Sequence, residues 1–173
     1  ELLGKLEETS TGIYEMSHIL YGGVFVRETK APEGFVLDTG VYEVMIDTDG
    51  KTCEVENKAG VGFINEAMRG NLKIVKTSSD GKIKGFAFRI TGANGYDIIL
   101  ETNDKGEIVI EGIRIGDYTV SEVSNSASAM YVLPADKKAT VKTGSTTIVE
   151  MHNVLRDTPK TGDATNLPLL YAL

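Results

Sequence analysis

The chain has 173 residues, of which 41% are hydrophobic, so it can bury a core and is not a wholly disordered protein. Its formal net charge of -7 excludes a surface built to hold nucleic acid or an anionic membrane. The single cysteine, Cys53, excludes an intramolecular disulfide framework, and with only His18 and His152 as histidines we expect no metal site and no cofactor.

Short strands are predicted along the chain, because apolar and polar residues alternate between turns rich in Gly and Asp. The alternation is clear at 72–74, 86–90, 108–110 and 118–120, and turns are predicted at 47–50, 79–81 and 103–106. The first of these turns, DTDG, resembles a calcium loop but lacks the later Glu, so we interpret it as a hairpin turn. No stretch has a helical period. The sequence therefore predicts an all-β fold.

An internal repeat divides the chain into two units. Residues 7–28 align without a gap with residues 101–122, which matches Gly12 with Gly106 and Glu28 with Glu122. We predict a complete β-sandwich at 70–155. At 1–67 we predict the C-terminal part of a similar sandwich, whose first two strands would precede residue 1. A very short linker at 66–70 would limit bending between the two units.

Polar residues end the apolar faces of several strands. Lys76 shares a strand face with Leu72 and Ile74, while Glu122 and Asn153 end the apolar faces of two later strands. Buried Lys and Glu are rare unless they are paired. Three interpretations follow: the side chains reach solvent at strand ends, Lys76 and Glu122 form a buried ion pair, or the residues react with each other.

The reactive interpretation rests on the chemistry of buried groups. Desolvation favours the neutral form of an amine, and a neutral amine is a nucleophile. An asparagine side-chain carbonyl is an electrophile with ammonia as its leaving group, and a buried carboxylic acid can shuttle the protons. The product would be an isopeptide bond between Lys76 and Asn153, formed once within the folded chain.

Two stretches resemble the B-type domains of Gram-positive collagen adhesins and pilins, also called Cna-B-type, SpaA-like or prealbumin-like domains. YGGVFVRETKAPEGFVLD, residues 21–38, resembles the family's E-box with Glu28 as the acid. GNLKIVKTSSDGK, residues 70–82, resembles the lysine-bearing first strand with Lys76 at the reactive position. The resemblance implies tandem Ig-like or prealbumin-like β-sandwiches, the first truncated at its N-terminus. It also implies that Glu122 is the acid and Asn153 the acceptor.

The two units depart from the family pattern in different ways. In the first unit Glu28 and Asn65 are present, but the partner lysine would lie upstream of this chain, because Lys5 aligns with Ile99 of a later strand. In the second unit Glu122 is followed by VSNSASAMY, which lacks the Ala-Pro-x-Gly segment of the E-box.

The pentapeptide TPKTG resembles the LPxTG sorting signal of sortase substrates. It comprises Thr158, Pro159, Lys160, Thr161 and Gly162, with Thr158 where Leu is usual. The resemblance implies cleavage by a sortase after Thr161 and transfer to an amine of peptidoglycan or of another pilin. An apolar run at 167–173 is too short to span a membrane, so we expect 156–173 to be a sorting signal and the start of a truncated span.

The main hypothesis is a structural stalk module of a secreted adhesin or pilin that is anchored covalently to the Gram-positive cell wall. The alternative is a ligand-binding module that contacts a host extracellular-matrix protein such as collagen. The only chemistry we expect is self-processing, so the chain is predicted to be a sortase substrate and not an enzyme, with no nucleic-acid partner.

Overall fold

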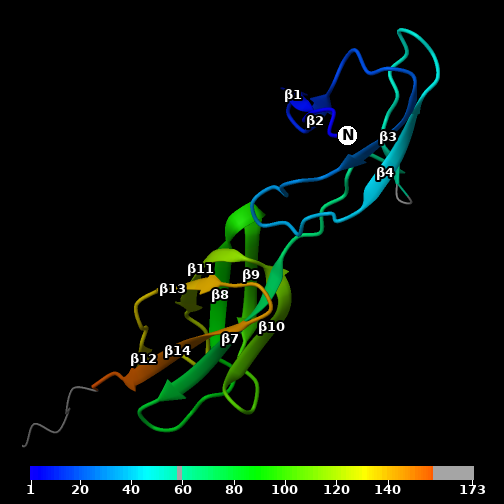
Figure 1. Ribbon diagram of the computed structural model, residues 1–173. Helices are drawn as coiled ribbons and strands as arrows, with labels where there is room; N and C mark the ends of the chain where they lie inside the picture. The colour runs from blue at the N-terminus through cyan, green and yellow to red at the C-terminus, as the bar shows by residue number, and fades with distance from the viewer. Residues whose placement is uncertain (58–59, 158–173) are drawn as a thin grey trace, which may run out of the picture. The chain divides into compact units, whose positions relative to one another are not determined.

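The computed structural model describes residues 1–57 and 60–157, and its strands are labelled in Figure 1. These residues form strands and turns, with one short 3-10 turn at Ala93–Gly95, so the predicted all-β class is confirmed. Within the described ranges, no helix has the length and apolar character needed to cross a membrane. The chain divides into two compact units, with the break between Met68 and Arg69.

The first unit contains three antiparallel strand pairs. They are β1 (Glu7–Ser10) with β2 (Ile13–Glu15), β3 (Gly22–Arg27) with β4 (Val41–Ile46), and β5 (Glu56–Asn57) with β6 (Gly60–Val61). In the β3–β4 pair one face carries Val44, which is 7% exposed, whereas the other carries Phe25, which is 70% exposed. The core of this unit is therefore small.

The second unit is a sandwich of two four-stranded sheets. One sheet has the order β10-β7-β14-β12, from β7 (Arg69–Ser78), β10 (Glu107–Arg114), β12 (Tyr131–Val132) and β14 (Thr146–Leu155). The other has the order β13-β11-β8-β9, from β8 (Ala87–Gly92), β9 (Tyr96–Glu101), β11 (Gly116–Val123) and β13 (Lys137–Val141). The first and last strands of the unit, β7 and β14, lie side by side and parallel (Figure 1).

The core lies between these two sheets, because both inner faces carry the apolar half of an alternating strand pattern. Its members come from both sheets and are Leu72, Ile74, Phe86, Phe88, Ile90, Ile108, Ile110, Ile113, Tyr118, Val120, Tyr131, Ala139, Val141, Val149 and Met151. The predicted alternation at 72–74, 86–90 and 118–120 thus identifies inward faces of this core.

Strand β10 departs from simple alternation. Ile108 and Ile110 face the core, but the next buried residue is Ile113 and not position 112. The pairing of β10 with β7 shifts register between Ile110 and Ile113, which marks a bulge. The predicted turn at 103–106 is closed by a hydrogen bond from the Gly106 amide to the Asn103 carbonyl, 2.9 Å. Gly106 has a φ of 73°, a conformation that favours glycine.

Candidate functional site

The sandwich brings Lys76, Glu122 and Asn153 to its interior. Lys76 is on β7 and Asn153 on the adjacent strand β14, where Met151 pairs with Lys76 and Asn153 with Ser78. Glu122 comes from β11 of the opposite sheet, on the same face as the core residue Val120. The exposed fractions are 1% for Lys76, 8% for Glu122 and 0% for Asn153. Escape of these side chains to solvent is therefore excluded.

A hydrogen bond joins the acid to the amide. The Asn153 side-chain nitrogen Nδ2 donates to Glu122 Oε1 at 2.7 Å. The remaining oxygens, Glu122 Oε2 and Asn153 Oδ1, are buried without a hydrogen-bond partner. A buried oxygen without a hydrogen bond costs about 1–3 kcal/mol of folding stability. Two such oxygens side by side would therefore be unfavourable if Glu122 and Asn153 served only to fill the core.

The Lys76 amine lies in an aromatic environment. Its Nζ is 4.0 Å from the centroid of the Phe86 ring and 5.9 Å from that of Tyr131, and it donates to the backbone carbonyl of Thr77. Burial lowers the pKa of Lys76, because the ammonium loses its hydration, although the negative charges of Glu122 and Asp80 oppose this shift. The neutral, nucleophilic amine is thus favoured relative to a lysine in water.

Burial has the opposite effect on the carboxyl. It raises the pKa of Glu122, and the hydrogen bond from Asn153 and the charge of Lys76 oppose the shift. Among the described residues, the ion pairs are between partly or largely exposed side chains such as Lys73 and Glu107, 2.7 Å apart, and none includes Lys76. The shifts favour a neutral amine beside a neutral acid over a buried ion pair.

The first unit contains a second pair of the same kind. Glu28 Oε2 accepts hydrogen bonds from the side-chain Nδ2 of Asn65 and from the backbone amide of Asp38, each at 2.7 Å. Asn65 also donates to the carbonyl of Val36 at 3.0 Å. Both members are half-buried, and Lys5 is exposed. The repeat therefore reproduces the acid and the amide of the second unit.

The segment after Glu122, which lacks the Ala-Pro-x-Gly pattern, forms a turn held by its own side chains. Asn125 Oδ1 accepts the amides of Ala127 and Ser128, each at 3.1 Å, and Asn125 Nδ2 donates to the carbonyl of Gly85 at 2.7 Å. This turn leads into β12 and the buried Tyr131. The alternation at 86–90 predicted that Phe86 points inward, but the sequence did not indicate that Phe86 and Tyr131 lie beside Lys76.

The predicted sorting signal, Thr158, Pro159, Lys160, Thr161 and Gly162, lies outside the described residues, as does the apolar run that follows it. The expectation that residues 156–173 form an anchor therefore remains a prediction.

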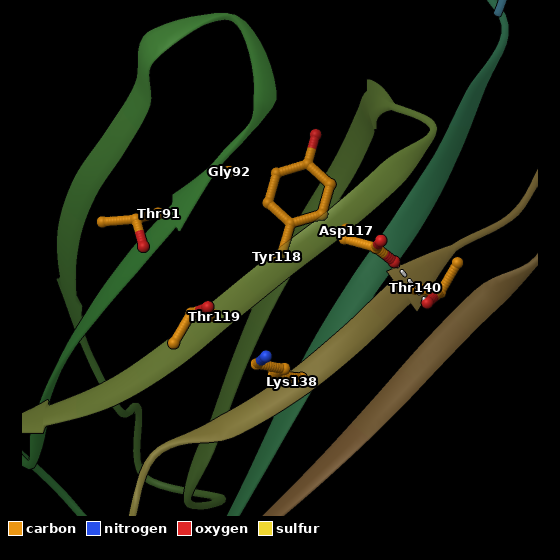
Figure 2. A pocket seen from close by; sticks show the side chains of 7 residues that line it. All are labelled: Thr91, Gly92, Asp117, Tyr118, Thr119, Lys138 and Thr140. Atoms are coloured by element: carbon orange, nitrogen blue, oxygen red, sulfur yellow. Dashed lines mark hydrogen bonds between the residues drawn. The ribbon is translucent and has the colours of Figure 1, made fainter.

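A surface pocket lies over β8, β11 and β13 of the second sheet, and Asp117 and Thr119 contribute to it from the outer face of β11 (Figure 2). Its lining is rich in hydroxyl groups and consists of Thr91, Gly92, Asp117, Tyr118, Thr119, Lys138 and Thr140. The Thr140 hydroxyl donates to Asp117 Oδ1 at 2.6 Å. The hydroxyl groups of this lining are suited to hydrogen bonding with a polar ligand.

Comparison with known proteins identifies the family. The model of the SpaA domain family, described as a prealbumin-like fold domain, matches residues 2–59 and again residues 70–155. These two ranges correspond to the two halves of the internal repeat. No curated protein matches the chain.

Similar solved structures include a minor pilin and a fragment of a pilus adhesin. The Bacillus anthracis TIE protein is 25% identical with a TM-score of 0.46, over 66% of this chain and 25% of that protein. The minor pilin GBS52 of Streptococcus agalactiae is 20% identical with a TM-score of 0.47, over 72% of each chain. A C-terminal fragment of the pilus adhesin SpaC from Lactobacillus rhamnosus GG is 13% identical with a TM-score of 0.54, over 90% of this chain and 88% of that fragment. The last similarity shows a shared fold along most of both chains.

Proposed function

Because the chain belongs to the SpaA family of prealbumin-like fold domains, we propose that it is a stalk segment of a pilin- or adhesin-type surface protein. In this proposal Lys76 and Asn153 form an intramolecular isopeptide bond with Glu122 as the acid. The observation that carries it is the burial of an amine, a carboxyl and an amide together between two sheets, with both pKa shifts directed towards neutral groups.

The reaction balances without a co-reactant. The neutral Lys76 amine attacks the side-chain carbonyl carbon of Asn153, the new carbon–nitrogen bond forms, and the bond to Nδ2 breaks. The protonated Glu122 delivers its proton to the leaving nitrogen, which departs as ammonia, and takes a proton in return from the attacking amine. Glu122 returns to its starting protonation state, whereas Lys76 and Asn153 are consumed. The chain therefore modifies itself once and does not turn over.

The orientation of the Asn153 amide decides how the acid acts. With Nδ2 towards Glu122, as observed, the hydrogen bond fits an ionised carboxylate. A rotation of the amide by half a turn would place Oδ1 opposite Glu122 Oε1, where a protonated acid can donate to it and polarise the carbonyl. The same rotation would give a partner to Asn153 Oδ1, which is otherwise unpaired.

The position of the bond suits a protein under tension. The unit begins with β7 at Arg69 and its last strand, β14, ends at Leu155. A force applied to both ends would follow β7 to Lys76, cross the covalent bond to Asn153, and leave through the end of β14. Residues 77–152 would then bear no load, so the sandwich could not be extended by unfolding.

The test is the intact mass of the purified full chain. Bond formation expels one ammonia, so the chain should weigh about 17 Da less than its composition requires. Lys76→Ala, Glu122→Ala and Asn153→Ala should each restore the full mass. Lys73→Ala is the matched control, because Lys73 is on the same strand but on the outer face, and it should keep the deficit. An unmodified wild-type mass would overturn the proposal.

For the first unit, the same proposal assigns the acid to Glu28 and the acceptor to Asn65. The support is the shared hydrogen-bond geometry, because the Asn-to-Glu distance is 2.7 Å in both units.

For the tail the proposal assigns a sortase as the partner and a peptidoglycan or pilin amine as the acceptor, which would anchor the protein to the cell wall. Incubation with a purified sortase and a small amine should release the peptide after Thr161, and Thr161→Ala should prevent this.

The second candidate function is binding of a host matrix protein, and its support is the hydroxyl-rich surface pocket of Figure 2. Surface plasmon resonance of the full chain on immobilised collagen would test it. Saturable binding that is lost in Thr119→Arg would support this function, and an absence of binding would oppose it.

A further inference from the structure

Tyr131 is tied to a carboxylate that is remote in sequence. Its hydroxyl donates to Asp80 Oδ1 at 2.7 Å, across 51 residues. Asp80 lies in the turn after β7 and also accepts the Ser78 hydroxyl at 2.9 Å and the Lys82 amide at 3.3 Å. Asp80 is thus held in place by its own turn, and it offers a fixed acceptor to the tyrosine.

The ring of Tyr131 completes the wall around the Lys76 amine. It is 1% exposed and packs edge-on against Phe86, with ring centroids 5.3 Å apart and planes at 65°. The amine is over the Phe86 ring at 4.0 Å and lies 5.9 Å from the Tyr131 centroid. Displacing the Tyr131 ring would therefore open a path for water to the amine.

The backbone of Tyr131 is fixed as well. Its amide donates to the carbonyl of Ser128 at 2.9 Å, and its carbonyl accepts from Arg156 Nε at 2.9 Å. It also pairs with Leu155 at the end of β14. The hydroxyl and backbone contacts together connect the turn after β7, the segment after Glu122 and the end of β14.

We propose that Tyr131 is a positioning residue for bond formation, whose hydroxyl, anchored on Asp80, keeps its ring closed beside Phe86 and excludes water from the Lys76 amine. This inference rests on the proposed isopeptide chemistry of the same site. Its effect is exerted through Lys76, because a wall that excludes water favours the neutral nucleophile.

The repeat offers an internal comparison. Residues 34–38, GFVLD, resemble residues 130–134, MYVLP, so that Phe35 occupies the position of Tyr131. Phenylalanine has no hydroxyl, so the first unit lacks this anchor. Tyr131→Phe therefore converts the second unit to the chemistry that the first unit already has at this position.

Three titratable groups face the Lys76 amine: Glu122 from β11, Asp80 from the turn after β7, and Tyr131 from β12. Asp80 acts on Lys76 in two opposed ways. Its negative charge favours the ammonium, whereas its hydrogen bond to Tyr131 keeps water out. Asp80→Asn separates these effects, because asparagine retains a carbonyl acceptor for the tyrosine and lacks the charge.

The first experiment measures the rate of bond formation in the full chain, made by cell-free synthesis and sampled for the loss of ammonia by intact mass. Tyr131→Phe should slow the reaction about tenfold, the scale of one hydrogen bond to a charged group. Asp80→Asn should not slow it. The matched control is Tyr118→Phe, which removes an equally short bond, 2.7 Å to the Arg114 carbonyl, from another buried tyrosine of the same unit.

The control should react at the wild-type rate. The anchoring role of Tyr131 would be overturned if Tyr131→Phe formed the bond at the wild-type rate. It would also be overturned if Tyr118→Phe or Asp80→Asn slowed bond formation as much as Tyr131→Phe does.

The second experiment does not depend on bond formation. In Asn153→Leu, which has no electrophilic carbonyl and leaves no cavity, the Lys76 amine stays free, and NMR of isotope-labelled lysine reports its pKa. Adding Tyr131→Phe should move that pKa up towards the ordinary value, whereas adding Tyr118→Phe should leave it unchanged. An unchanged pKa in the Tyr131→Phe variant would overturn this inference. If the wild-type chain shows no mass deficit, the proposed function fails, and this titration alone decides whether Tyr131 shields the amine.

Discussion

Replacing Lys76 by methionine isolates the energetic contribution of the covalent bond. Methionine has a similar length and no charge, so it fills the same space between Phe86 and the neighbouring strand without leaving a buried ammonium. Truncation of Asn153 is less informative, because it opens a cavity at a fully buried position and removes the hydrogen bond to Glu122.

The expected magnitude follows from the size of the loop that the bond closes. Lys76 and Asn153 bracket almost the whole second unit, since they lie on its first and last strands. In the chain-entropy treatment used for disulfides, closing a loop of this length stabilises the fold by on the order of 4 kcal/mol. For a domain of this size, each 1 kcal/mol shifts the melting temperature by about 4–8 °C. Lys76→Met should therefore lower the melting temperature of the second unit by roughly 15–30 °C.

Thermal unfolding of the full chain, followed by circular dichroism, measures this shift. Lys73→Met is the matched control, because it removes a partly exposed lysine from the outer face of the same strand, where its ion pair with Glu107 is worth about 1 kcal/mol or less. If the wild-type chain carries the mass deficit and Lys76→Met nevertheless melts within a few degrees of it, the loop-closure reasoning is wrong.

Three further predictions concern pH and packing. In Lys76→Met the pKa of Glu122 stays above its ordinary value of 4.5, so Glu122 keeps its proton up to a higher pH in the folded state than in the unfolded state. The free energy of unfolding, measured with urea, should therefore fall as pH rises above about 4.5. Adding Glu122→Gln should flatten this dependence. For Asp80 the sign is reversed, because the hydrogen bond from Tyr131 helps to lower its pKa to about 2. It stabilises the fold above its ordinary value of 3.8 and ceases to do so as pH falls towards 2, so Asp80→Asn should reduce the acid sensitivity of the melting temperature in that window. Gly92→Ala should destabilise the second unit by about 1–3 kcal/mol in urea unfolding, because the added Cβ would lie 2.4 Å from the Tyr118 ring.

Strand parity predicted the inward faces of several strands of the second unit. The alternation that puts Leu72 and Ile74 inside also puts Lys76 inside, and the structure buries all three. Parity failed where the backbone departs from regular geometry, since the bulge in β10 makes Ile113 the next buried residue after Ile110. A bulge inserts an extra residue into one strand, so strict alternation misplaces the residues that follow it.

Contacts between loops were beyond the reach of the sequence for a different reason. Asp80 and Tyr131 meet across 51 residues, and neither belongs to an alternating pattern that would relate them. Asp80 was predicted as a turn residue, which is where the structure puts it, but a turn residue has no parity to indicate its partner. The position of the turn could be predicted, whereas the tyrosine that it anchors could not.

The absence of the Ala-Pro-x-Gly segment after Glu122 raises the question of what positions the acid in the second unit. Its backbone is fixed by β11, where Glu122 pairs with Phe88 of β8, and Tyr118 and Val120 orient the same face towards the core. In the first unit β3 ends at Arg27, one residue before Glu28, and the amide of Asp38 from the following loop holds that carboxylate. The second unit therefore positions its acid by strand pairing and the first by its loop, so the E-box segment is not needed to keep Glu122 directed inward.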